Sequence, residues 1–202
     1  MSTYASLTQD IQDFAENDDS EFTGEIDGFI LRSEEKIFRE APLLSVFRAE
    51  NTGTLTASTA TLTMPTGKRT IRSFSITVSS SEVFLQQRTD SYLQDMYPNS
   101  STTGQPKYYA EKDASTLLLG PTPNSNYAYT IRAREQPTGL SSGNTTTWLS
   151  SNTEDVLLFA CMVEACLFLK NSEAVAAWSA QYAQALQSLQ TEMGLNLSHE
   201  NS

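Results

Sequence analysis

The chain is poor in the residues that most often build catalytic and metal sites. Its 202 residues include one histidine, His199, and two cysteines, Cys161 and Cys166. The cysteines lie five positions apart on one predicted helix, where their side chains diverge too far for a disulfide and lack a neighbouring histidine for a zinc site. His199 follows a predicted helix end, so no Ser-His-Asp or Cys-His arrangement is expected. We therefore predict no enzyme activity, no metal site and no cofactor, and interpret the cysteines as small core residues.

Long apolar runs are also absent. The longest, residues 156–169, is interrupted by Glu164 and is shorter than the roughly 20 residues that cross a bilayer. The N-terminus has neither the basic nor the apolar region of a signal peptide. These absences predict a soluble protein made in the cytoplasm, with no membrane partner.

Positive charge is scarce, and both ends of the chain lack it. Lys and Arg number 13 against 24 Asp and Glu, which gives a net charge of −11, and no Lys or Arg precedes Arg32 or follows Lys170. An acidic surface repels phosphate backbones, so tight binding to the outside of DNA is not expected.

Apolar residues at helical spacing predict two helices near the N-terminus. Ser6 and Gln9 have the spacing of a capping box before the first, and the second is expected over residues 21–40. Gly24 and Gly28 fall inside the second helix, where each costs about 1 kcal/mol relative to Ala. Either the close approach of another helix or a weakly formed first turn accounts for them.

Two further helices are predicted in the last third of the chain. Ser151 and Glu154 have capping-box spacing for a helix over residues 152–170. Ser172 caps the next helix, which Gly194 is expected to end. Its apolar stripe consists of Val175, Trp178, Tyr182, Leu186, Leu189 and Met193. We interpret Trp178 and Tyr182 as helix-packing residues, although aromatic rings also bind sugars or bases by stacking.

The middle of the chain has the composition of β-structure. Residues 45–88 are rich in Thr, Ser and β-branched side chains, which predicts short antiparallel strands. Three more strands are expected over residues 107–110, 116–119 and 127–134, with a turn at 121–124. A polar loop, residues 137–146, precedes the last helices.

These elements predict an α+β fold. Residues 1–44 and 150–193 form an antiparallel helical bundle, residues 45–149 form an inserted antiparallel β subdomain, and residues 194–202 form a C-terminal tail.

The remaining charged residues give few candidate sites. Lys68, Arg69, Arg132 and Arg134 lie on predicted strands, where they contact phosphate, pair with carboxylates of a neighbouring chain, or are simply exposed. Adjacent acidic residues on a helix point to different sides, so we interpret the three acidic pairs as solvated rather than as ion sites. The pairs are Asp18-Asp19, Glu34-Glu35 and Glu154-Asp155.

Several short motifs follow one another in a fixed order along the chain. They are GQPKY at 104–108, LLGPTP at 118–123, WL at 148–149, EACLFLK at 164–170 and WSAQYAQAL at 178–186. Together they resemble the head-to-tail adaptor (connector) family of tailed bacteriophages, and the resemblance runs from Thr3 to Met193.

The resemblance implies a structural protein of the virion neck, assembled in the host cytoplasm. Such adaptors form a ring, commonly of twelve copies, that joins the portal protein to a tail or nozzle protein and lets DNA pass without sequence-specific binding. Their C-terminal segments often contact the portal, which makes Leu195, Leu197 and His199 candidate portal contacts. Lys68, Arg69, Arg132 and Arg134 are candidate contacts with the tail or a neighbouring copy.

Two other classes of function compete with this interpretation. A carbohydrate-binding or fibre-attachment module of a virion would use the β-rich middle, but its loops hold Ser, Thr, Asn and Gly rather than exposed aromatic residues. A small hydrolase is disfavoured because no nucleophile and base pair is visible.

Overall fold

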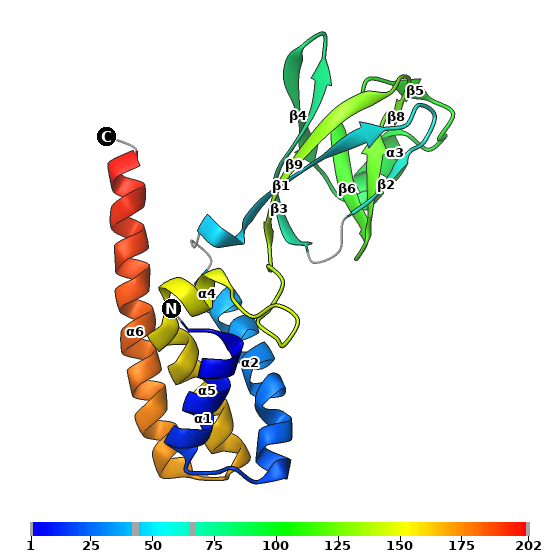
Figure 1. Cartoon of the computed structure of the whole chain (residues 1–202). Helices are drawn as coiled ribbons and strands as arrows, with labels where there is room; N and C mark the ends of the chain where they lie inside the picture. Colours follow the sequence, from blue (N-terminus) through cyan, green and yellow to red (C-terminus); the bar gives the residue numbers. More distant parts are fainter. Residues whose placement is uncertain (1, 42–44, 65–67, 201–202) are drawn as a thin grey trace. The chain divides into compact units, whose positions relative to one another are not determined.

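The computed structural model describes residues 2–41, 45–64 and 68–200 (Figure 1). Residues 1–47 and 136–202 form one compact unit, here called the helical unit, and residues 48–135 form a second, called the β unit. The part of the chain that is described contains six α-helices and a seven-stranded sheet, so the structure is of the mixed α+β class that the sequence predicts.

The helical unit is built from both ends of the chain. Its elements are α1 (Tyr4–Ala15), α2 (Ser20–Glu40), the 3-10 turn η1 (Ser45–Phe47), α4 (Trp148–Asn152), α5 (Glu154–Phe168) and α6 (Ser172–Glu200). α5 packs against α1, α2 and α6, and it is buried on nearly every side because it is apolar all round. Cys161 and Cys166 are free thiols in this buried helix, as predicted.

Two of the predicted N-caps are wrong by about one turn. α1 begins after Thr3, whose hydroxyl accepts from the Ser6 amide, while the Thr3 amide donates to the Ser6 hydroxyl. Thr147 and Ser150 form the same capping box before α4. The Thr153 hydroxyl donates to the Leu149 carbonyl at 3.0 Å. Helix α4 ends before Thr153, and α5 begins after it. Several hydroxyl residues in a row offer the capping spacing more than once, so the spacing alone does not select the cap.

Two predictions about α6 also need correction. The Asn171 side chain accepts from the Ala174 amide at 3.1 Å, so Asn171 rather than Ser172 caps the helix. Gly194 does not end the helix, which continues to Glu200. Glycine weakens a helix by about 1 kcal/mol but does not forbid it, and no proline follows to stop the chain.

The β unit contains a sheet in the order β1-β9-β3-β4-β6-β7-β2 and a separate pair, β5-β8. Its elements are β1 (Arg48–Leu55), β2 (Thr61–Thr63), β3 (Lys68–Val78), β4 (Ser81–Gln87), α3 (Asp90–Met96), β5 (Thr103–Gly104), β6 (Tyr108–Asp113), β7 (Thr116–Gly120), β8 (Thr122–Pro123) and β9 (Tyr127–Glu135). Most neighbours are antiparallel, as predicted, but β4 pairs with β6 in parallel, and the expected turn at 121–124 contains the short strand β8.

Alternation along the strands builds the core of the β unit. Phe74 and Ile76 of β3 and Ile131 and Ala133 of β9 face the same buried cluster, in which Phe74 is fully buried. The polar residues between them point to the other face of the sheet, where Arg132 is partly exposed, whereas Ser75 is buried and donates to Glu82.

Candidate assembly sites

Arg132, a predicted contact residue, lies at the centre of an ion-pair network on the β unit. Its guanidinium donates to Glu50 of β1 at 2.9 Å and to Glu82 of β4 at 3.0 Å. The Ser75 hydroxyl also donates to Glu82 at 2.6 Å, and together with Arg132 it lowers the pKa of Glu82. Arg132 thus pairs with carboxylates of its own chain, across four neighbouring strands.

The other predicted basic residues gather at one end of the same sheet. Arg134 of β9 lies opposite Arg48 of β1 and Thr70 of β3, and Lys68 lies opposite Glu135. Burial lowers the pKa of Arg134. The side chains of Lys68 and Arg69 lie outside the described part of the structure.

The predicted portal contacts lie on the last two turns of α6. The backbone of Leu195, Leu197 and His199 is helical, and this end of the helix extends past the other helices of the helical unit (Figure 1). Their side chains fall outside the described residues.

Trp178 and Tyr182 pack within the helical unit. The Trp178 ring lies 5.7 Å from the rings of both Phe14 and Phe159. The Tyr182 hydroxyl donates to the Glu40 carboxylate at 2.6 Å, and the Lys36 ammonium lies 4.4 Å from the centre of its ring. Burial, and then the bond to Glu40, raises the pKa of Tyr182.

Glu34 is the functional candidate that the sequence interpretation missed. It was expected on a solvated face, but only 5% of it is exposed. Both carboxylate oxygens accept from the Leu140 amide, each at 3.1 Å, and burial raises the pKa of Glu34 to about 7. A signal was present, because Glu34 lies four residues after Ile30 and three before Ile37, on the buried stripe of α2.

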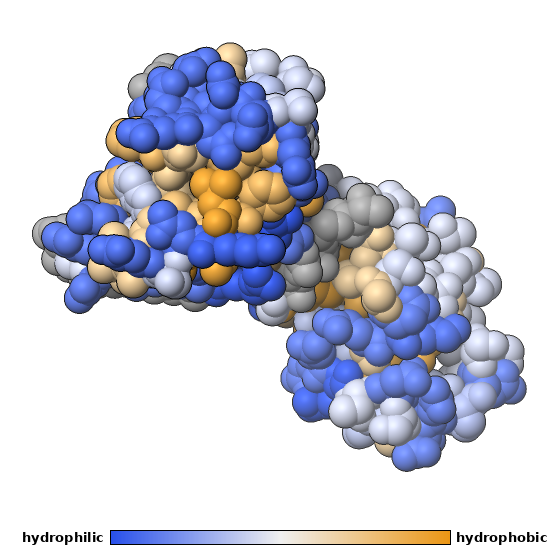
Figure 2. Space-filling model, turned by 90° about the horizontal axis from the view of Figure 1, so that it is seen from below, coloured by the Kyte–Doolittle hydropathy of each residue, from blue (hydrophilic) through white to orange (hydrophobic). Residues whose placement is uncertain are grey.

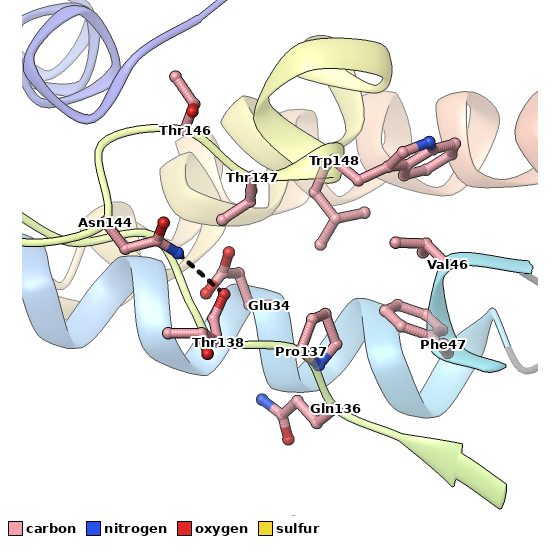
Figure 3. Close-up of a pocket in the computed structure, with 11 residues that line it drawn as sticks. Glu34, Val46, Phe47, Gln136, Pro137, Thr138, Asn144, Thr146, Thr147 and Trp148 are labelled. Atoms are coloured by element: carbon pink, nitrogen blue, oxygen red, sulfur yellow. Dashed lines mark hydrogen bonds between the residues drawn. The ribbon is translucent and has the colours of Figure 1, made fainter. Parts of the chain in front are cut away.

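Glu34 lies at one end of a pocket of about 240 Å³ within the helical unit. Figure 3 shows Glu34 with Thr138 and Asn144 at this end and Val46, Phe47 and Trp148 toward the other. The Asn144 amide donates to the carbonyls of Thr138 and Gly139, at 3.1 and 2.9 Å. The loop from residue 136 to 147 is thereby fixed as one wall of the pocket.

The helical unit also exposes apolar surface. Figure 2 shows such a patch bordered by hydrophilic residues. The large apolar side chains exposed on this unit include Phe14, Leu31, Leu167 and Phe168. No described residue lies within 4 Å of a Cβ placed on Gly24, so no other helix of the described part of the chain approaches this glycine closely.

The described residues include neither a membrane-spanning helix nor a cluster of metal ligands. No helix among them is both long and apolar enough to cross a bilayer. No group of three or more His, Cys, Asp or Glu side chains among them is arranged to hold a metal ion.

Comparison with known proteins places the chain in a family. The family profile described as SU10 adaptor protein matches residues 2–198. No curated protein matches the sequence. The profile covers both units and nearly the whole chain, as the ordered motifs predicted. The chain therefore belongs to the SU10 adaptor protein family, a family of bacteriophage structural proteins.

Proposed function

We propose that this protein is a head-to-tail adaptor that forms a ring between the portal and a tail or nozzle protein, with twelve copies by analogy with similar adaptors. The family match over residues 2–198 carries this proposal. Under this proposal, the protein is assembled in the host cytoplasm and resides in the neck of the virion. The helices form the antiparallel bundle of each subunit, into which the β unit is inserted.

Two surfaces, one on each unit, would serve different partners. The end of α6 extends past its neighbouring helices, which suits a contact of Leu195, Leu197 and His199 with the portal. The basic end of the sheet, with Lys68, Arg69, Arg132 and Arg134, would contact the tail protein or a neighbouring copy.

The charge of the helical unit fits a channel that DNA crosses without binding. Asp18, Asp19 and Glu21 are exposed beside the start of α2, and carboxylates that face a channel repel phosphate. Replacing all three with Lys should slow DNA ejection and make it depend on salt. Unchanged ejection across a range of salt concentrations would remove this role.

The direct test mixes the purified protein with its portal protein and images the particles by electron microscopy. Rings are expected on the portal, and a chain truncated after Met193 should not attach. A matched control, Asn196→Ala in the full chain, should still attach. Failure of the wild-type chain to form rings, alone or on the portal, would contradict the proposal.

One observation favours a carbohydrate-binding or fibre-attachment module instead. On the β unit, the Arg88 guanidinium lies 5.7 Å from the Tyr92 ring and 5.6 Å from the Tyr108 ring, at a surface where rings can stack on ligands. Saturable binding to immobilised glycans that Tyr92→Ala and Tyr108→Ala both abolish would support that alternative.

A further inference from the structure

The Glu34 pocket has two chemically different ends. The carboxylate of Glu34 closes one end, beside Asn144, and Val46, Phe47 and Trp148 provide apolar contacts toward the other (Figure 3). An occupant that satisfies both ends needs an apolar stem and a hydrogen-bond donor at its tip.

The Glu34 carboxylate has few hydrogen-bond donors for a residue that is 95% buried. It accepts from one amide, that of Leu140, which both oxygens share. The Asn144 amide is already bonded to two carbonyls, and no Lys or Arg in the described part of the chain forms an ion pair with Glu34. A buried carboxylate of this kind requires either a proton or a cation.

The size of the pocket favours a single side chain as the occupant. Its volume of about 240 Å³ lies below the roughly 300–1,000 Å³ of sites for drug-sized ligands. Lys and Arg bury an apolar stem and carry the charge at the tip, and the Arg fork matches both oxygens of a carboxylate.

The distribution of charge between the units indicates where such a side chain comes from. The helical unit contains 17 Asp and Glu and four Lys and Arg, so its formal charge is −13. The β unit contains seven Asp and Glu and nine Lys and Arg, so its formal charge is +2. A ring joins two different surfaces of the same chain, and these two units attract each other between copies. The exposed cations of the β unit include Arg72, Arg88, Lys107 and Lys112.

We propose that the Glu34 pocket of one copy receives a Lys or Arg side chain from the β unit of a neighbouring copy. The inference rests on the proposed ring for the source of the cation, but the chemistry of the pocket can be tested on the isolated chain.

The first experiment uses n-butylguanidinium as the probe and Trp148 as the reporter. The chain has two tryptophans, so Trp178→Phe leaves Trp148 as the only one. Titration should change its fluorescence in a saturable way, and Glu34→Gln should weaken the apparent affinity roughly thirtyfold or more, as expected when one partner of a buried charge pair is removed. Glu25→Gln, an exposed carboxylate on the same helix, should leave the affinity unchanged.

Three results of this titration would overturn the proposal. They are the absence of a saturable response, an equal response to neutral n-butylurea, and an affinity that Glu34→Gln leaves unchanged. If Glu34→Gln does not fold, as circular dichroism would show, Val46→Phe provides a second variant that leaves Trp148 as the only tryptophan. It fills the apolar end, keeps the carboxylate and should block the probe, and unchanged binding by it would equally overturn the proposal.

The second experiment identifies the source of the cation in rings formed on the portal. Glu34→Lys should prevent ring formation, and so should the Glu variant of one of the nine Lys and Arg residues of the β unit. Mixing the two defective chains should restore rings through the reversed pair, and failure of all nine mixtures would overturn the neighbouring copy as the source. If the wild-type chain forms no ring at all, the proposed function and this source both fall, while the probe titration still decides the chemistry of the pocket.

Discussion

The helical unit and the β unit handle charge in opposite ways. The helical unit has a formal charge of −13 and buries one carboxylate, Glu34, against a single amide. The β unit is close to neutral and keeps its ion pairs at the surface, where Arg132 bridges Glu50 and Glu82. A buried charge without a counter-ion costs far more than an exposed pair contributes. The unfavourable electrostatics of the chain are therefore concentrated in the helical unit, where partners would relieve them.

The two cores also differ in how the chain supplies them. The β unit is a continuous segment, residues 48–135, whereas the helical unit joins residues 1–47 to residues 136–202. Each has its own cluster of buried residues. A continuous segment with its own core can unfold and refold while the rest stays folded.

Truncating a large buried side chain in either core has the largest expected effect on stability. Phe29 in the helical unit and Phe74 in the β unit are both fully buried, so Phe29→Ala and Phe74→Ala should each cost about 3–5 kcal/mol of stability in their own unit. Trp148 and Trp178 both lie in the helical unit, so tryptophan fluorescence during urea unfolding reports this unit alone.

Only Phe29→Ala should move that fluorescence transition. Amide hydrogen exchange should show faster opening of β3 and β9 in Phe74→Ala. An equal shift of the tryptophan transition in both variants would show that the two units unfold as one.

The buried carboxylate gives the next effect, and its sign is opposite to that of an ordinary ion-paired acid. Burial raises the pKa of Glu34 from about 4.5 to about 7. The folded state therefore holds a proton that the unfolded state loses first, and this stabilisation is complete below about pH 4.5 and lost as pH rises through 7. The free energy of unfolding of the helical unit should fall by about 2.5 kcal/mol between pH 5 and pH 8.

Glu34→Gln removes this dependence while keeping an acceptor for the Leu140 amide. Cys161, the other titratable group in electrostatic contact with Glu34, has its pKa raised to about 12 and does not titrate in this range. The difference between wild type and Glu34→Gln also cancels any contribution of His199. Parallel pH profiles for the two proteins would rule out Glu34 as the source.

Phe29, Phe74 and Glu34 show where sequence reasoning succeeds and where it ends. Periodicity placed Phe29 in a helix and Phe74 in a strand, because local spacing and burial agree at both positions. The same helical period put Glu34 on the buried stripe, but its partner, Leu140, is 106 residues away in sequence. No local pattern reveals a contact of that range, and a solvated face was the simpler interpretation of Glu34-Glu35.

The helix ends were less predictable than the helices for a local reason. Thr147, Ser150 and Ser151 all carry a hydroxyl that can cap a helix. The capping box forms on Thr147, where the backbone is extended immediately before α4. Similarly, Gly194 is permitted both inside a helix and after one, so it does not by itself fix the end of α6.

Removing the N-cap of α4 should have a smaller but measurable effect on the stability of the helical unit. Thr147→Ala removes the acceptor for the Ser150 amide and should destabilise the helical unit by about 1 kcal/mol. Ser151→Ala, the cap that the sequence suggested, should change the stability by less than about 0.5 kcal/mol. Urea midpoints that reverse this order would show that the capping box lies on Ser151 in solution.

The smallest effect is expected at Arg132, and its dependence on pH should be the reverse of that at Glu34. Arg132 and Glu82 are exposed, so Arg132→Gln should lower the urea midpoint of the β unit, followed by hydrogen exchange, only slightly. The difference should vanish near 1 M salt, where the screening length is about 3 Å. Because the Ser75 hydroxyl and Arg132 lower the pKa of Glu82, this stabilisation is present above the ordinary carboxyl pKa and is lost as pH falls. Acid should therefore erase the difference between wild type and Arg132→Gln in the β unit, whereas acid stabilises the helical unit. A difference that persists at low pH and high salt would mean that Arg132 acts through packing of its stem rather than through its charge.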